Sequence, residues 1–97
     1  MTARRKQVES NIERKEKMNN NVRICNALAA LESGRALLED YADSHGWEAI
    51  DNDKHLESVQ RVAKEDVRKA QAERTEESAR RAYESAIIFE YHVNKTY

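Results

Sequence analysis

The residues that most often carry protein chemistry are few and scattered in this chain. Its three histidines, His45, His55 and His92, lie far apart in sequence, and no HExxH, ExxH or CxxC pattern occurs. Zinc sites and metalloprotease sites need such spacings because they bring two ligands to one face of a helix or turn. The sequence therefore predicts no metal site built on histidine or cysteine.

The single cysteine, Cys25, cannot form an internal disulfide, and it lies among apolar residues of a helical pattern. Thiolate formation is disfavoured in apolar surroundings, so a nucleophilic role would need a remote histidine and an unfavourable site. We expect Cys25 to be a small buried hydrophobic residue.

One segment has the alternate spacing of a calcium-binding loop, with Asp51, Asp53 and His55. Such a loop also needs a glycine at its sixth position and a glutamate at its twelfth, and this chain has Leu56 and Val62 there. We interpret the segment as helix caps and solvated side chains. The two glycines form no phosphate-binding loop. The sequence thus predicts no catalytic, cofactor-binding or metal-binding residue.

Composition points to one small, highly charged helical domain spanning residues 1–97. Charged residues make up 36% of the chain, yet 17 bases nearly balance 18 acids and the net charge is −1. Val, Ile, Leu and Phe number only 17 of 97, which limits the size of any core. There is no proline and strong helix formers dominate, so long helices meet no obstacle.

The chain divides into two long helical stretches, 3–43 and 54–94, joined by a turn at 44–53. Gly46 follows the first stretch as a left-handed helix terminator would, and the acidic segment 51–53 offers N-caps for the second. Apolar residues recur at helical spacing in three stripes. These stripes are Ile24, Leu28, Leu31, Leu38 and Ala42; Leu56, Val59, Ala63, Val67 and Ala70; and Ala79, Ala82, Ala86, Phe89 and Val93.

Both stretches are polar near their centres, at 19–21 and at 73–77, where Asn21 and Thr75 could each cap a new helix. The predicted fold class is therefore all-α, and the sequence is compatible with two arrangements of the helices. One is an antiparallel hairpin of two long helices, and the other is a bundle of three or four shorter helices. In the hairpin, Val8 and Ile12 would pack against the C-terminal apolar residues.

Two helices alone bury one seam, and the C-terminal apolar run points in more directions than one partner helix can cover. We therefore predict self-association, most simply as a twofold homodimer. The residues assigned to it are Ile87, Ile88, Phe89 and Val93. The composition of residues 86–93 is also compatible with a short strand.

Charge is distributed unevenly along the chain. Residues 1–23 contain seven bases and three acids, whereas residues 24–60 contain two bases and eight acids. The basic segment could contact nucleic-acid phosphates, but acids interrupt it and no aromatic residue is interleaved, so we favour a solvated helix face. Its bases are Arg4, Arg5, Lys6, Arg14, Lys15 and Lys17.

The acidic segment places two apolar groups, Trp47 and Ile50, in the predicted turn. Tryptophan is a common anchor of protein interfaces, and acidic neighbours would steer a basic partner towards it. The alternative is that Trp47 folds back over the ends of its own helices. The candidate partner-binding residues are Trp47, Ile50, Asp43, Glu48, Asp51 and Asp53.

The leading functional hypothesis is a non-enzymatic interaction protein, either an adaptor or an inhibitor of a larger protein complex. Small helical proteins of this kind are frequent among phage and mobile-element factors that act on host enzymes or defence systems. The alternative is a small dimeric nucleic-acid-associated regulator that uses the basic N-terminal helix. A third possibility is that the acidic end imitates nucleic acid. No window approaches a membrane span, and we expect a cytoplasmic protein without cofactors.

Overall fold

The computed structural model describes the backbone of residues 2–97 and the side chains of residues 19–97. It contains four helices, α1 (Thr2–His45), α2 (Glu48–Asp51), α3 (Lys54–Glu73) and α4 (Glu76–Thr96). No strand occurs within residues 2–97. The all-α prediction is confirmed, and the segment 86–93 is helical.

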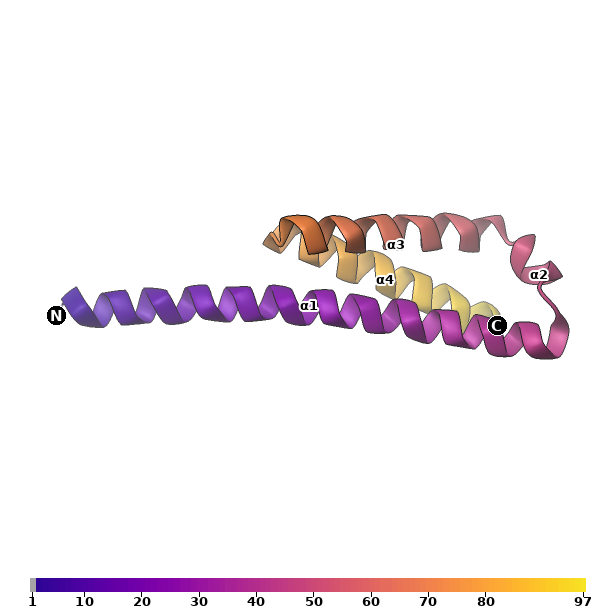
Figure 1. Ribbon diagram of the computed structural model, residues 1–97, viewed down its shortest axis with the longest axis horizontal. Coiled ribbons are helices and arrows are strands. Elements are labelled where there is room, and N and C mark those ends of the chain that lie inside the picture. Colours follow the sequence, from indigo (N-terminus) through magenta and orange to yellow (C-terminus); the bar gives the residue numbers. More distant parts are fainter. Residues whose placement is uncertain (1) are drawn as a thin grey trace.

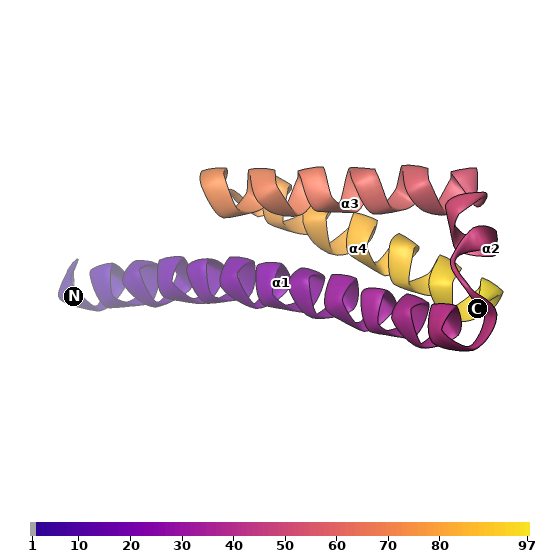
Figure 2. The ribbon, with the colours of Figure 1, turned by 45° about the vertical axis from the view of Figure 1, so that its right-hand side comes forward.

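Helices α1, α3 and α4 pack against each other in a bundle, and the chain as a whole is elongated, with principal extents of 66 × 19 × 18 Å. The chain runs along α1, reverses through α2, returns along α3, and reverses again into α4, so that α4 is parallel to α1 (Figure 1). Helix α4 packs extensively against both α1 and α3, whereas α1 and α3 touch each other less. The first part of α1 extends beyond the ends of α3 and α4 (Figures 1 and 2).

Local signals in the sequence explain where α1 ends and where α3 and α4 begin. Gly46 has φ of 82°, and its amide bonds the Ala42 carbonyl at 2.7 Å, which terminates α1. Asp53 caps α3, since its Oδ1 accepts the Leu56 amide at 3.0 Å. Thr75 caps α4 in a capping box with Ser78.

The second long stretch is broken, so the bundle replaces the two-helix hairpin. Arg74 ends α3 in the left-handed conformation, with φ of 54°, and its amide bonds the Ala70 carbonyl. The first stretch is not broken, because α1 continues through Asn21. The Asn21 side chain instead accepts a hydrogen bond from Arg74 Nη1 at 3.1 Å, which joins α1 to the α3–α4 turn.

The core consists of two clusters along the bundle axis. The cluster beside the α3–α4 turn contains six alanines among eight buried residues, which lets the helices approach closely: Ile24, Ala27, Ala30, Val67, Ala70, Ala79, Ala82 and Ala86. The cluster beside α2 contains Ala63 and four larger side chains, Leu38, Leu56, Phe89 and Val93. Among residues 19–97, Phe89 and Val93 are the largest side chains that are completely buried.

This placement corrects the packing expected for the hairpin. Phe89 and Val93 were expected to lie near the N-terminus, beside Val8 and Ile12. They pack instead against Leu38 at the opposite end, because the second reversal of the chain carries α4 back along α1. The side chains of Val8 and Ile12 lie outside the described residues.

No helix within the part of the chain that the structure describes combines the length and the apolar character that crossing a membrane requires.

Candidate functional site

The turn between α1 and α3 carries an exposed aromatic side chain, Trp47. Trp47 is 51% exposed and precedes the single-turn helix α2. The backbone holds it in place, because the Asp51 amide donates to the Trp47 carbonyl at 2.8 Å. About half of the Trp47 surface is therefore accessible to solvent and about half is covered.

The acids predicted to surround Trp47 have different environments. Asp43, Glu48 and Asp51 are exposed. Ile50 is half-buried and packs against the Leu38 and Leu56 cluster, so it anchors the turn to the core. The surface formed by Trp47, Asp43, Glu48 and Asp51 is called the acidic Trp47 surface below.

Asp53, which the sequence also assigned to this surface, forms hydrogen bonds within the fold. Its Oδ1 accepts the Leu56 amide, and its Oδ2 lies 2.9 Å from His92 Nε2 and 2.7 Å from the Tyr97 hydroxyl, which donates to it. With its proton on Nε2, His92 donates as well. Asp53 therefore joins the start of α3 to the last residues of the chain and is unavailable to a partner.

The surroundings of Asp53 act in opposite directions on its acidity. Burial raises the pKa of the carboxyl group, but the hydrogen bonds from Leu56, His92 and Tyr97 stabilise the carboxylate and outweigh it. The net result lowers the pKa of Asp53 from 3.8 to about 2. Burial and the bond to Asp53 raise the pKa of the Tyr97 hydroxyl to about 12. The ionised Asp53 and the neutral Tyr97 are thus the forms that the fold favours at neutral pH.

We expect Asp53→Ala to lower the free energy of unfolding by about 2 kcal/mol at pH 7, because the variant loses an N-cap and two further hydrogen bonds. The folded pKa of Asp53 lies below its unfolded value, so its contribution is complete above about pH 4 and is lost as the pH falls towards about 2. The difference between wild type and variant in urea unfolding should therefore shrink between pH 4 and pH 2. A difference that is constant with pH would contradict this role of the charge.

Aromatic and histidine rings contact one another next to the hydrogen bonds of Asp53. Tyr41 stacks on His45 with ring centroids 4.3 Å apart, and it meets Tyr97 edge-on at 4.9 Å. His55 meets His92 edge-on at 4.7 Å. These contacts join the end of α1 to Tyr97 and the start of α3 to the end of α4.

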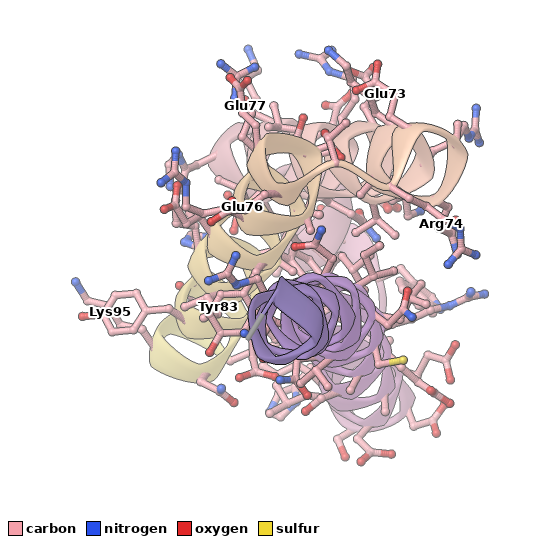
Figure 3. The ribbon with its side chains drawn as sticks, turned by 90° about the vertical axis from the view of Figure 1, so that its left-hand side faces the viewer. Glu73, Arg74, Glu76, Glu77, Tyr83 and Lys95 are labelled. Atoms are coloured by element: carbon pink, nitrogen blue, oxygen red, sulfur yellow. The ribbon has the colours of Figure 1, made fainter. Side chains whose placement is uncertain are left out.

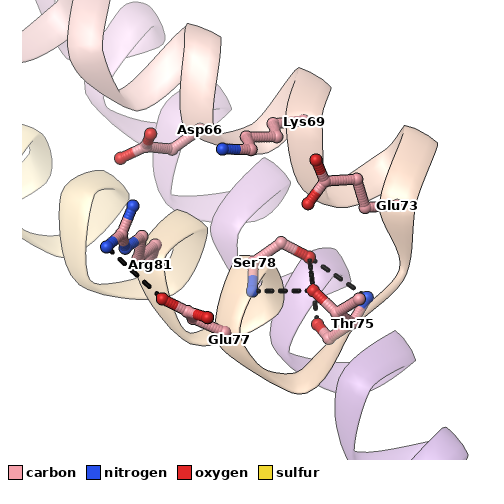
Figure 4. Close-up of a pocket in the computed structure, with 7 residues that line it drawn as sticks. All are labelled: Asp66, Lys69, Glu73, Thr75, Glu77, Ser78 and Arg81. Carbon is pink, nitrogen blue, oxygen red and sulfur yellow. Dashed lines mark hydrogen bonds and ion pairs between the residues drawn. The ribbon is translucent and has the colours of Figure 1, made fainter.

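A small polar hollow lies at the other end of the bundle, beside the α3–α4 turn (Figure 4). Its walls carry both charge signs, and the Glu77 and Arg81 side chains pair across one helical turn at 3.4 Å. Ser78 and Thr75 at its base bond each other within the capping box. These bonds account for the hollow as the capped start of α4. The lining residues are Asp66, Lys69, Glu73, Thr75, Glu77, Ser78 and Arg81.

The remaining chemically active residues are dispersed. Cys25 is exposed, so the expectation that it is buried was wrong; it lies on α1 next to buried Ile24 but on the solvent side. Within residues 19–97, no three metal-ligating side chains gather around a common point. The six bases of the N-terminal segment, from Arg4 to Lys17, lie on α1 outside the residues whose side chains are described.

The four residues assigned to self-association separate into two pairs. Phe89 and Val93 point into the core and are completely buried, so they are not available to a second chain. Ile87 and Ile88 are 40% and 55% exposed. The periodicity of the helix explains the separation, since residues 87 and 88 fall on the side of α4 opposite the stripe that contains 86, 89 and 93. Tyr91, which the sequence interpretation omitted, is exposed on the same outer side.

No family model, curated protein or solved structure matches this chain.

Proposed function

We propose that this chain is a non-enzymatic interaction protein, an adaptor or an inhibitor, that binds a larger protein through its acidic Trp47 surface. The exposure of Trp47 carries this proposal. A large indole that is half accessible to solvent, in a turn that the backbone holds in place, is the type of group that dominates protein interfaces when it enters a partner's pocket.

The residues that order the turn around Trp47 favour tight binding. Ile50 is packed on the core, and Asp53 fixes the start of α3 directly after the turn. A turn that is already ordered loses little conformational entropy on binding. The exposed acids Asp43, Glu48 and Asp51 would favour a partner whose pocket has basic residues at its rim.

We expect Trp47→Ala to weaken partner binding about 30-fold to 1000-fold, the range found when an interface anchor is truncated. The helical content and the unfolding midpoint should stay close to wild type, because the side chain contributes little to the core. The assay is an affinity capture from nuclease-treated lysate, followed by measurement of the affinity for the captured protein. Val62→Ala, which truncates an apolar side chain of similar exposure on α3, is the matched control. Equal binding by both variants would contradict the proposal.

We also propose that the protein acts as a homodimer. The side of α4 that faces away from the core exposes Ile87, Ile88 and Tyr91, which supports burial against a second chain.

A nucleic-acid-associated regulator is the second candidate function. Its supporting observation is that the basic N-terminal part of α1 extends beyond the bundle, where a groove could receive it (Figure 2). Salt-dependent binding to duplex DNA, lost when Arg4, Arg5 and Lys6 are replaced by Ser, would favour this candidate over the first.

A further inference from the structure

The outer face of α4 has the spacing of a coiled-coil seam. Glu84, Ile88, Tyr91 and Lys95 are all exposed and follow one another in steps of four, three and four. This alternation gives the 3.5-residue repeat that keeps a stripe facing a partner helix. The buried stripe that contains Ala86, Phe89 and Val93 occupies the opposite side of the same helix.

The apolar part of this face lies at its centre and the charges lie at its ends. Ile88 and Tyr91 are 55% and 65% exposed, and Tyr91 is the most exposed of the large hydrophobic residues within 19–97. Lys95 points away from α1 and α3, whereas Tyr83 lies beside α1 (Figure 3). The seam is therefore clear of the other helices of its own chain.

The order of the charges along α4 favours antiparallel over parallel pairing with α4 of a second copy. When two such seams run antiparallel about a twofold axis, Ile88 lies opposite Tyr91 of the second copy, and Glu84 lies opposite its Lys95. Both pairs occur twice because of the symmetry. A parallel pairing would place Glu84 against Glu84 and Lys95 against Lys95, which is repulsive.

From this face we infer that α4 pairs antiparallel with α4 of a second copy, with Ile88 and Tyr91 at the centre and Glu84 and Lys95 pairing between the chains. The inference rests on the homodimer proposed above and specifies its surface and register. The interface is small, so we expect association in the micromolar range.

A charge-reversal cycle tests the register. Sedimentation equilibrium across the micromolar range is run for wild type, Glu84→Lys, Lys95→Glu and the double variant. Each single reversal turns two attractive pairs into two repulsive ones and should weaken the dimer about tenfold. The double variant restores opposite charges and should return to within about threefold of wild type. Glu84 and Lys95 are three turns apart in one chain, so this rescue cannot arise within a monomer.

A second set of variants tests the apolar centre. Ile88→Ser should weaken the dimer about 100-fold, because both copies lose buried area, whereas Val62→Ser on α3 should leave it unchanged. A wild-type protein that stays monomeric would overturn both the homodimer and this surface. A wild-type dimer that is insensitive to Ile88→Ser and to the charge reversals would overturn the surface alone, and a dimer weakened without rescue in the double variant would overturn the register.

Discussion

Replacing Phe89 with Ala should lower the free energy of unfolding by about 3–5 kcal/mol, a large share of the roughly 5–15 kcal/mol typical of a domain. Phe89 is completely buried between α1, α3 and α4, and together with Val93 it is the largest side chain in that state. The other cluster consists largely of alanines and has little apolar area with which to compensate. Urea unfolding followed by circular dichroism measures the loss.

The matched control for Phe89→Ala is Val62→Ala, which truncates an exposed side chain and should change the unfolding free energy by less than about 0.5 kcal/mol. A loss of under about 1 kcal/mol in Phe89→Ala would mean that α4 does not pack between the other helices as described.

The second large effect concerns Gly34, where a change to alanine should destabilise the protein although such a change in a helix normally stabilises it. An alanine in place of a glycine within an exposed helix normally stabilises it by about 1 kcal/mol. At Gly34 the added Cβ would lie 2.5 Å from Phe89 Cε1, and α4 or the ring must move to relieve the clash. We expect Gly34→Ala to destabilise the protein by about 1–3 kcal/mol.

Two further variants isolate the cause at Gly34. Adding Phe89→Leu to Gly34→Ala makes room for the methyl group, so the two changes together should cost less than the sum of their separate effects. Ser33→Ala on the exposed side of α1 should be neutral or slightly stabilising. Thermal unfolding of the wild type, the three single variants Gly34→Ala, Phe89→Leu and Ser33→Ala, and the double variant provides the comparison. If Gly34→Ala raised the midpoint, the close approach of α1 and α4 would be refuted.

Local patterns in the sequence predicted the helices well. The stripe from Ala79 to Val93 is buried at every position, and Gly46 ends α1. Two candidate caps had different outcomes for a physical reason. Thr75 gains a capping box from Ser78, whereas Asn21 lies within the continuous helix α1 and its side chain accepts a hydrogen bond from Arg74 instead. Side-chain type alone did not separate these two cases.

The sequence did not predict the direction of α4, and several errors followed from this. The second reversal depends on Arg74 adopting a left-handed conformation, which non-glycine residues seldom do. Because the sequence does not predict this reversal, it does not place His92 and Tyr97 beside Asp53. Their hydrogen bonds to Asp53 were therefore not predicted. These partners are 39 and 44 residues from Asp53 in the chain, and no local spacing indicates them.

The sequence places Trp47 and its acids in one turn, but it does not show which of them the fold itself uses. The composition of the turn identified Trp47 and its acids, and the structure separates exposed Asp43, Glu48 and Asp51 from the structural Asp53. At this end of the bundle Ile50 and Tyr97 pack against the core and Tyr41 meets Tyr97 edge-on, while Trp47 stays half exposed.

Site-specific crosslinking at position 47 tests the proposed function most directly. A photoreactive phenylalanine analogue is placed at Trp47 in one protein and at Val62 in another, and both are irradiated in nuclease-treated lysate. The acidic Trp47 surface predicts one dominant protein adduct from position 47, absent from position 62 and suppressed by an excess of unmodified wild type. The same adducts from both positions, or an adduct that the Trp47→Ala protein suppresses equally well, would contradict binding through this surface.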